Sequence, residues 1–484
     1  MSKSYVVYKD VAPMAEQDAS PSAIGAEQFS NPSLLTSGAN TNKAITLELN
    51  RWLLGGEHDY LDRNSVAFWS ELLSGADCSF DVAPSIDIQF SEQHSSVGIT
   101  LVFDETDGDF CTLVNVTWYR GSSVLANVDF HPTGTNYFCE HQVTAFDRIV
   151  ITPKETSLPY RRAKITHIVF GLHRRFGIDE MRSAKIIQQT SLISTEVPIS
   201  TFDFSLENRG NVSFMFQLKQ PMEVWNDNSL LGVFYIDEHK RASSSLYEID
   251  CYNAIGILDE TQFDGAVYSS ASAIGILTDI VGSDFTLNFE VSDVTLSGAI
   301  MSGTRREAMQ QVLFAAGWLC ATDSDSGIRI FKLDDTLTEI ERNRTFSGVS
   351  STISAIVTEV RVMAHQYAVN SNGSVEINGT KYYDTKTVYS IKNPNVTAND
   401  KQSVVEVTEA TLVSPDIVQS VAQRVYDYYM MRQTDSAKVV WKGEKIGDYV
   451  SLPTAWGTEH AGHIKKMTIT LSNTVAADVE TVGV

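Results

Sequence analysis

Residues 303–333, GTRREAMQQVLFAAGWLCATDSDSGIRIFKL, carry the strongest local signals in the sequence. Thr304 is followed three positions later by Glu307, the spacing at which two side chains satisfy the free amides of a helix start. Apolar residues then recur at three- and four-residue steps, which gathers them on one helix face. They are Ala308, Met309, Val312, Leu313 and Ala316. The pattern predicts a helix over 305–317 that packs against a core.

Two short strands are predicted after this helix. Gly317 ends the helix, because glycine readily adopts the left-handed conformation of a C-terminal cap. Residues 319–322 and 328–332 flank DSDSG, whose Asp, Ser and Gly residues favour a turn. The whole stretch is therefore predicted as helix, strand, tight turn and strand.

The totals place the chain among folded proteins with several domains. A chain of 484 residues is too long to fold around a single hydrophobic core. At about 100 to 200 residues per domain, its length predicts about three domains. Hydrophobic residues make up 43% and charged residues 20%, as in ordinary folded proteins. The formal charge of −23 argues against a surface that binds phosphates, so no sequence-specific nucleic-acid partner is expected.

The spacing of the cysteines and the shortness of the apolar runs argue against metal-binding, redox, secreted and membrane proteins. The five cysteines are scattered and lack the paired spacings of zinc sites or redox motifs, so we expect mostly buried thiols. They are Cys78, Cys111, Cys139, Cys251 and Cys320. The start lacks a signal peptide, and no run of about 18 apolar residues occurs, so neither secretion nor membrane insertion is expected.

The first 176 residues are predicted as two regions. Residues 1–73 have few apolar runs and form an extended N-terminal arm, with Trp52, Phe68 and Trp69 as its anchors. Residues 74–176 form a β-sandwich of short strands separated by turn signals. The clearest strands are SIDIQF, GITLVFD, LVNVTWY, SVLANVDF, RIVITP and ITHIVFG. In LVNVTWY, period two places Trp118 on the core face rather than on a ligand platform.

The remaining chain is predicted as two more β-rich parts. Residues 177–333 carry strands, including SSLYEIDCYNAIGIL, and close on the helix 305–317 with its strand pair. Residues 334–484 carry strands, then a helix over 415–430, and end as β structure. Ser414 is the expected N-cap of this helix and Pro415 its first residue. The fold class is thus mainly β with a few helices.

No catalytic or cofactor signature occurs. The sequence lacks a nucleophile elbow, an H-E-x-x-H zinc motif, a Walker loop and a dinucleotide-binding glycine pattern. We therefore predict no catalytic residues and no cofactor. FDETDGDF offers Asp104, Asp107 and Asp109 as calcium ligands, but a solvated turn is the favoured interpretation. Asp323 and Asp325 of DSDSG lack the terminal glutamate of an EF-hand and are assigned to a turn. No metal site is predicted, and the ligand-binding residues are unknown.

The stretch around the helix 305–317 resembles a segment of tail proteins from phages and prophages of Gram-positive bacteria. In those proteins an R-E-A-x-Q-Q helix precedes F-A-x-G and a strand pair. Matching residues here are Arg306, Glu307, Ala308, Gln310, Gln311, Phe314, Ala315 and Gly317. LLGVFYIDE upstream and GDYVSLPTAWGTEHAGHIKKMTITLS downstream are similar to their barrel strands, so the resemblance covers about residues 190–484.

The resemblance implies a baseplate hub or tail-tip protein and no enzyme. It implies β-barrel domains that assemble as a homo-oligomer, usually a trimer. The expected partners are tail-tube, distal-tail, spike or tip, and tape-measure proteins. The chain would be made in the bacterial host cytoplasm and end in the virion tail or baseplate.

The 74–176 region resembles a discoidin-type or carbohydrate-binding β-sandwich with a jelly-roll architecture. Such modules bind glycans or serve as inert docking parts. This leaves a second hypothesis, a tail adhesion protein whose β-sandwich recognises host cell-surface polysaccharide. A tail-associated hydrolase is the third.

Overall fold

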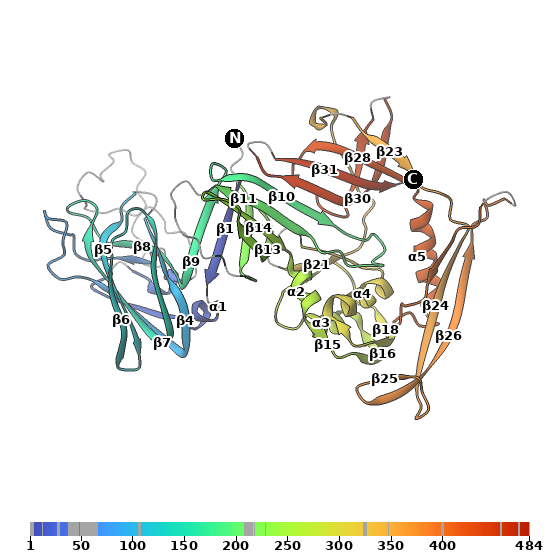
Figure 1. Ribbon diagram of the computed structural model, residues 1–484, viewed down its shortest axis with the longest axis horizontal. Coiled ribbons are helices and arrows are strands. Elements are labelled where there is room, and N and C mark those ends of the chain that lie inside the picture. Colours follow the sequence, from blue (N-terminus) through green and yellow to red (C-terminus); the bar gives the residue numbers. More distant parts are fainter. Residues whose placement is uncertain are drawn as a thin grey trace. The chain divides into compact units, whose positions relative to one another are not determined.

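The computed structural model divides the chain into two compact units. Unit 1 comprises residues 1–7 and 175–484, and unit 2 comprises residues 8–174. The structure describes residues 4–11, 13–26, 30–36, 48, 66–104, 108–207, 216, 218–227, 229–322, 327–346, 348–397, 401–454, 457–472 and 475–483. Strands predominate in both units, which confirms a mainly β fold with a few helices (Figure 1). No helix in the described part of the chain is long and apolar enough to cross a membrane.

Unit 2 is built on a seven-stranded sheet with the order β3-β8-β4-β7-β5-β6, in which β2 also pairs with β4. Its strands are β2 (Ser20–Ile24), β3 (Phe68–Trp69), β4 (Ser85–Phe103), β5 (Cys111–Arg120), β6 (Ser123–Phe130), β7 (Asn136–Thr156) and β8 (Lys164–Val169). The helix α1 (Pro13–Asp18) and the 3-10 helix η1 (Pro32–Leu35) complete it. Unit 2 thus includes residues 8–36, which the sequence assigned to the arm; the anchor Trp52 lies outside the described residues.

The two long strands β4 and β7 pair over two stretches. Ile86–Gln89 align with Arg148–Ile151, and Gly98–Val102 align with Asn136–Glu140. Register shifts separate the two stretches, and such bulges bend a strand. Side chains from both stretches therefore reach one core, which holds Ile86 and Leu101 together with Trp118.

The sequence placed Trp118 on the buried face of its strand, and the structure confirms this. Val114, Val116 and Trp118 of β5 are all fully buried. Phe68 of β3 is also fully buried and belongs to the same core. Trp118 is therefore a core residue and offers no stacking surface to a ligand.

Unit 1 is built on a 13-stranded sheet with the main order β23-β28-β31-β30-β10-β11-β14-β13-β12-β1-β9, and β29 joins β22 to β30. The strands from the first part of the chain are β1 (Ser4–Val11), β9 (Gly171–Gly177), β10 (Met181–Gln189), β11 (Thr201–Glu207), β12 (Pro221–Asn226), β13 (Ser229–Arg241) and β14 (Leu246–Tyr252). The C-terminal strands are β22 (Leu337–Glu339), β23 (Ser350–Ile353), β28 (Gln433–Val440), β29 (Tyr449–Pro453), β30 (Glu459–Thr470) and β31 (Ala476–Gly483).

One strand pair joins the two parts that the sequence divided at residue 333. Lys185–Gln189 of β10 pair antiparallel with Lys466–Thr470 of β30. The predicted boundaries 177–333 and 334–484 therefore separate segments that share one hydrogen-bonded sheet.

Three helices and several short strands pack beside this sheet (Figure 1). The helices are α2 (Ala254–Glu260), α3 (Ala273–Val281) and α4 (Arg305–Ala316). The short strands are β15 (Gln262–Phe263), β16 (Ala266–Ser272), β17 (Leu287–Phe289), β18 (Thr295–Ile300), β19 (Gly303–Thr304), β20 (Leu319–Ala321) and β21 (Ile328–Phe331). Residues 254–258 lie in the helix α2, so the strand prediction for them is wrong. The β-branched isoleucines favour strands locally, but Ile255 and Leu258 are buried against the helical core.

A four-stranded sheet with the order β25-β26-β24-β27 packs against the helix α5 (Val418–Met430). Its strands are β24 (Glu359–Val369), β25 (Val375–Ile377), β26 (Thr380–Lys392) and β27 (Val404–Val407). Figure 1 shows α5 beside the long β24–β26 hairpin. Val418, Val421 and Val425 form the buried face of α5, as predicted.

The predicted start of α5 is wrong by three residues. The helix begins at Val418 with Ile417 as its N-cap, and neither Ser414 nor Pro415 occupies the predicted position. The Ser414 carbonyl accepts hydrogen bonds from the amides of both Ile417 and Val418. A tight turn therefore precedes the helix and takes the place of a side-chain cap.

Candidate functional site

The helix α4 packs into the hydrophobic core of unit 1 and carries the residues of the sequence resemblance. Its capping box is formed as predicted: Glu307 N donates to Thr304 Oγ1 at 3.1 Å, and Thr304 N donates to Glu307 Oε2 at 2.9 Å. The Ala308, Met309, Val312 and Leu313 side chains are buried. The local pattern therefore fixed both the start of this helix and the face that packs on the core.

The polar residues of α4 bind neighbouring segments of the same chain. Arg306 Nε donates to Asp259 Oδ1 of α2 at 2.7 Å, and Arg306 Nη1 donates to the Val197 carbonyl at 3.1 Å. Gln310 Nε2 donates to the Ser194 carbonyl at 3.0 Å. Arg306 and Gln310, two residues of the motif shared with tail proteins, thus bind the loop that follows β10.

Gln311 extends this network to the segment that follows β27. Its Nε2 donates to the Glu409 carbonyl at 3.0 Å, and its Oε1 accepts from Thr411 N at 3.0 Å. The amide side chain therefore uses both its donor and its acceptor to bind main chain from the last part of the sequence. The helix α4 is a brace between the two β-rich parts.

The C-terminus of α4 is capped by a residue from another helix. Gly317 adopts the left-handed conformation with φ of 70°, and a Cβ there would lie 2.5 Å from Arg424 Nη1. Arg424 of α5 donates to the Phe314 carbonyl. Burial lowers the pKa of Arg424 to about 10, because the interior disfavours its charge. Glycine at position 317 thus provides both the turn and the space for the arginine.

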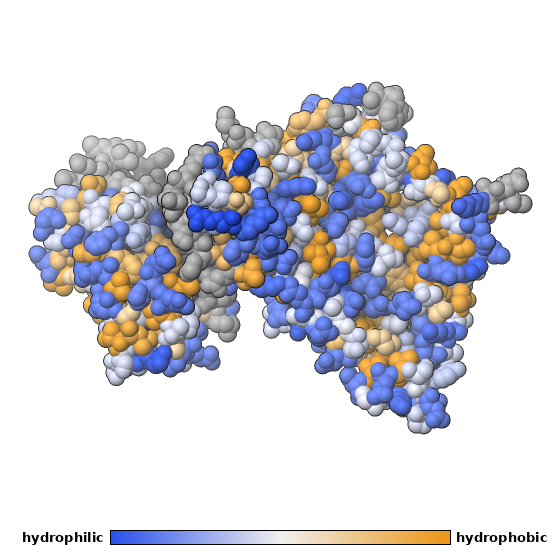
Figure 2. Space-filling model, viewed as in Figure 1, coloured by the Kyte–Doolittle hydropathy of each residue, from blue (hydrophilic) through white to orange (hydrophobic). Residues whose placement is uncertain are grey.

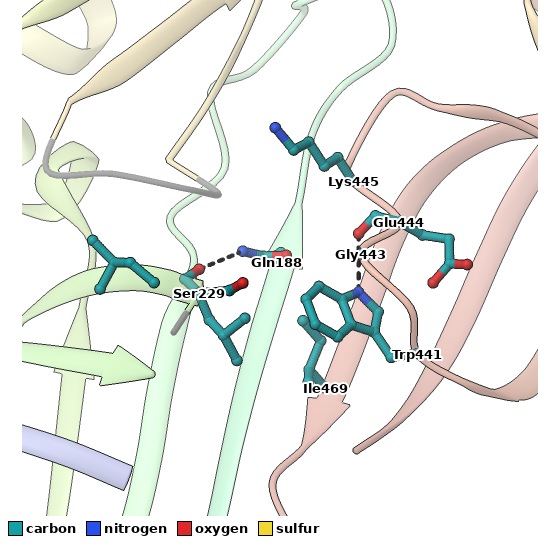
Figure 3. A pocket seen from close by; sticks show the side chains of 9 residues that line it. Gln188, Ser229, Trp441, Gly443, Glu444, Lys445 and Ile469 are labelled. Carbon is teal, nitrogen blue, oxygen red and sulfur yellow. Dashed lines mark hydrogen bonds between the residues drawn. The ribbon is translucent and has the colours of Figure 1, made fainter. Parts of the chain in front are cut away.

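A pocket of about 340 Å³ opens beside β10, β13 and β30 (Figure 3). Trp441 Nε1 donates to the Glu444 carbonyl at 3.0 Å, and Gln188 Nε2 donates to the Leu231 carbonyl at 3.5 Å. Figure 3 shows the Glu444 carboxylate pointing away from Gln188, and this carboxylate pairs with Arg344. The described lining therefore supplies an indole, an amide and an amine, and Arg344 engages the carboxylate of its Glu444.

The candidate calcium turn of unit 2 contributes to a buried charge network. Asp104 and Asp109 both face Lys164, whose Nζ lies 3.8 Å and 3.5 Å from their carboxylates. Lys164 Nζ also lies 2.8 Å from Glu48 Oε2, and both side chains are fully buried. Arg161 Nε lies 3.5 Å from Asp109 Oδ1. An internal ammonium therefore provides the positive charge for these carboxylates; Asp107 lies outside the described residues.

Asp323 and Asp325 of DSDSG lie outside the described residues, whereas the flanking β20 and β21 pair antiparallel as predicted. Across the described residues, no group of three or more His, Cys, Asp and Glu side chains is arranged to hold a metal ion.

One Ser–His–Asp grouping occurs at the edge of the large sheet. His460 Nδ1 lies 3.4 Å from Ser351 Oγ and 3.2 Å from Asp435 Oδ1. A catalytic triad places the serine and the carboxylate on opposite imidazole nitrogens. Both groups share Nδ1 here, so this arrangement cannot relay a proton from serine. Sequence spacing gave no indication of the grouping, since its members are 84 and 25 residues apart.

The cysteines are free thiols, and four of the five are buried. Burial raises the pKa of Cys111, Cys139 and Cys251, because a thiolate is disfavoured in an apolar interior. It raises the pKa of Cys320 to about 12. These cysteines are therefore structural side chains, as the sequence predicted.

No family model and no curated protein sequence matches the chain. Among solved structures, the chain is similar to a tail protein from Neisseria meningitidis MC58, at 12% identity over 65% of this chain and 94% of that chain, with a TM-score of 0.48. A prophage tail protein from Listeria monocytogenes EGD-e is 12% identical over 64% of this chain and 91% of that chain, with a TM-score of 0.42. A family 32 CBM from C. perfringens, solved with galactose, is 10% identical over 35% of this chain and 98% of that chain, with a TM-score of 0.22.

Proposed function

We propose that this chain is a non-enzymatic structural component of a phage tail or phage-tail-like particle. In this role it is a baseplate hub or tail-tip protein that joins the tail tube to the spike or to peripheral baseplate proteins. The observation that carries the proposal is the α4 brace. The residues through which the sequence resembles tail proteins, Arg306, Gln310 and Gln311, are all engaged in holding the chain's own loops.

A helix that ties distant segments of its own chain together in this way suits a tail protein that transmits force or holds neighbouring tail proteins in register. The α4 side chains link α2, the loop after β10 and the segment after β27. The charge of −23 also suits a ring through which DNA passes, because an acidic surface does not retain phosphates. Localisation in the virion tail follows from this role.

Mass measurement of the purified full chain in solution, combined with negative-stain imaging, tests the proposal. We expect a ring-shaped homo-oligomer, a trimer, that associates with the tail-tube protein of the same particle. Antibody labelling of whole particles should mark the tail tip. A chain that stays monomeric at all concentrations and labels no part of the tail would contradict the proposed function.

A second candidate function is glycan recognition by unit 2, and Tyr160 favours it. Tyr160 is 44% exposed and has a φ of 57°, a conformation that costs a non-glycine residue roughly 1–3 kcal/mol. Ser74 Oγ accepts from Arg161 N at 3.1 Å and holds the adjoining main chain in place. Tyr160 is thus an exposed aromatic residue on a main-chain turn that hydrogen bonds hold in place, two positions after the exposed Leu158.

A glycan array probed with the full chain tests this second candidate. Binding to cell-wall polysaccharide that Tyr160→Ala abolishes would support it. Tyr383→Ala, which removes a tyrosine of unit 1 that is 56% exposed, is the matched control and should bind as the wild type does. Absence of binding by the wild-type chain would exclude glycan recognition.

A further inference from the structure

His365 of β24 is a buried histidine with an oxygen acceptor at each ring nitrogen. Figure 2 shows hydrophilic residues over the surface of the β24–β26 hairpin, but the His365 side chain is only 3% exposed. Its Nδ1 lies 2.9 Å from Asp384 Oδ2 of β26, and its Nε2 lies 3.0 Å from the carbonyl oxygen of Thr408. A neutral imidazole carries a single N–H group and donates to only one of these oxygens. The geometry therefore requires one proton more than a neutral imidazole and a carboxylate hold together.

Two arrangements of this proton satisfy both contacts. Either the imidazole is protonated on both nitrogens beside a carboxylate, or Asp384 is a carboxylic acid that donates to Nδ1 while Nε2–H donates to Thr408. Both arrangements hold the same number of protons, so His365 and Asp384 titrate as one pair. The other carboxyl oxygen of Asp384 is buried without a hydrogen-bond partner among the described residues. The hydrogen bond with His365 is therefore the one that Oδ2 of this buried group makes.

The Thr408 end of the contact belongs to segment 408–413, which follows β27. The main chain of this segment also binds both the amide nitrogen and the amide oxygen of Gln311 in α4. The main-chain amide of His365 donates to the Val413 carbonyl at 2.8 Å. Segment 408–413 thus connects the β24–β26 hairpin to the α4 brace, and the His365 side chain fastens one end of this connection.

A second cation competes with His365 for the same carboxylate. Lys386 lies opposite His365 in the β24–β26 register, and its Nζ is 3.8 Å from Asp384 Oδ2. The ring of Tyr367 stacks on the imidazole, with 6.2 Å between the ring centres. Burial, together with the charges of Asp384 and Glu409, raises the pKa of Tyr367 above its usual value of 10.0, so its hydroxyl stays neutral. The proton can therefore leave the pair while Lys386 keeps Asp384 paired.

The other elements that contact β24 contribute no further charge to the pair. The helix α5 packs on the face of β24 that carries Val362 and Ala364, and His365 points to the opposite face because successive side chains of a strand alternate. The strand β18 has the sequence TLSGAI and carries no titratable side chain. On the side of His365, Arg361 and Glu406 bind each other at 2.8 Å. The electrostatic surroundings of the pair are therefore set by β26 and by segment 408–413.

We propose that His365 and Asp384 form a proton-dependent clasp that fastens segment 408–413 to the β24–β26 hairpin and releases it in alkaline solution. When hydroxide removes the proton, a lone pair on one ring nitrogen faces an oxygen lone pair in the interior, and that hydrogen bond is lost. The contact between the hairpin and the α4 brace is then loosened. This inference concerns contacts within unit 1 and is independent of the proposed tail function.

Hydrogen exchange of the full-length chain, followed by mass spectrometry at neutral and at alkaline pH, tests the proposal. Labelling times are scaled to the intrinsic exchange rates at each pH. Opening of segment 408–413 should increase by up to about tenfold per pH unit once the pair loses its proton, because one proton is linked to the contact. Peptides from β10 and β30 are the internal reference and should show no such increase.

Two substitutions separate the clasp from a general effect of alkaline solution. Asp384→Asn should keep segment 408–413 protected at both pH values, because the new amide donates to Nδ1 and Nε2–H donates to Thr408 without an additional proton. Lys386→Met should move the release to higher pH, since it removes the cation that competes for Asp384. Lys240→Met, at an exposed lysine elsewhere in unit 1, is the matched control and should behave as the wild type does.

Constant protection of segment 408–413 in the wild type between the two pH values would overturn the clasp. An Asp384→Asn chain that loses protection at alkaline pH as the wild type does would overturn it as well. If Asp384→Asn does not fold, Lys386→Met decides, and a release that stays at the wild-type pH or moves to lower pH refutes the proposal. None of these results would affect the proposed tail function, which solution mass and particle labelling test separately.

Discussion

Arg424 of α5 lies over the ring of Phe314 in α4, with its guanidinium carbon 5.5 Å from the ring centre, and it donates to the Phe314 carbonyl. The side chain therefore covers an aromatic face and caps the C-terminus of α4 at the same time, where cations interact favourably with the helix dipole. Since α5 packs on the β24–β26 hairpin, this contact links that hairpin to the α4 brace.

Replacing Arg424 with Met should lower the free energy of unfolding of unit 1 by about 1–3 kcal/mol. The loss follows because the Phe314 carbonyl is left in the interior without its charged donor. Denaturant unfolding of the full chain measures the change. Arg241→Met, at an exposed arginine, should change stability little; equal effects from both substitutions would contradict the capping role.

Replacing Leu313 with Asp should prevent unit 1 from folding. Leu313 is fully buried, and an unpaired carboxylate there would lose its hydration. The milder Leu313→Ala should cost about 2–5 kcal/mol. Solubility and circular dichroism report the outcome, with Leu218→Asp as the exposed control. A soluble, normally assembling Leu313→Asp chain would refute the placement of α4 in the core.

Replacing Lys164 with Met should destabilise unit 2 by about 3–5 kcal/mol. The substitution leaves Glu48, Asp104 and Asp109 without the ammonium that faces all three, and a buried charge without its partner is costly. Lys154→Met breaks the exposed pair with Asp129 and should cost no more than about 1 kcal/mol. Thermal unfolding compares the two variants; similar values would contradict the central role of Lys164.

Asp18 should make the stability of unit 2 depend on pH. Hydrogen bonds from the Ser91 side chain, from His94 and from the Glu92 amide hold the pKa of Asp18 well below its usual value of 3.8. A lowered pKa means that the stabilisation is present above pH 3.8 and is lost as the pH falls below that value.

The stability difference between the wild type and Asp18→Asn should therefore be present above pH 3.8 and shrink as the pH falls below that value. Thermal unfolding at neutral pH and at acidic pH values measures it. Asp81→Asn, at an exposed aspartate, controls for the change in net charge. A difference that grows as the pH falls would contradict the sign of this effect.

Several features were predictable because they depend on residues close together in the chain. The capping box follows from the three-residue spacing of Thr304 and Glu307, and the buried face of α4 follows from the helical period of its apolar residues. The burial of Trp118 follows from the two-residue period of its strand. The start of α5 was mispredicted although Ser414 and Pro415 suit a helix start. A tight turn there satisfies the first amides with a main-chain carbonyl instead.

The sequence by itself determined the mainly β class, the existence and ends of α4, and the absence of recognisable catalytic motifs. Only the tertiary structure decided that Arg424 caps a helix 110 residues away and that Lys164 neutralises Asp104 and Asp109. It alone also decided that β10 pairs with β30. The physical reason is range: capping and periodicity act within a few residues, whereas buried charges and strand edges find partners only after distant segments have packed together.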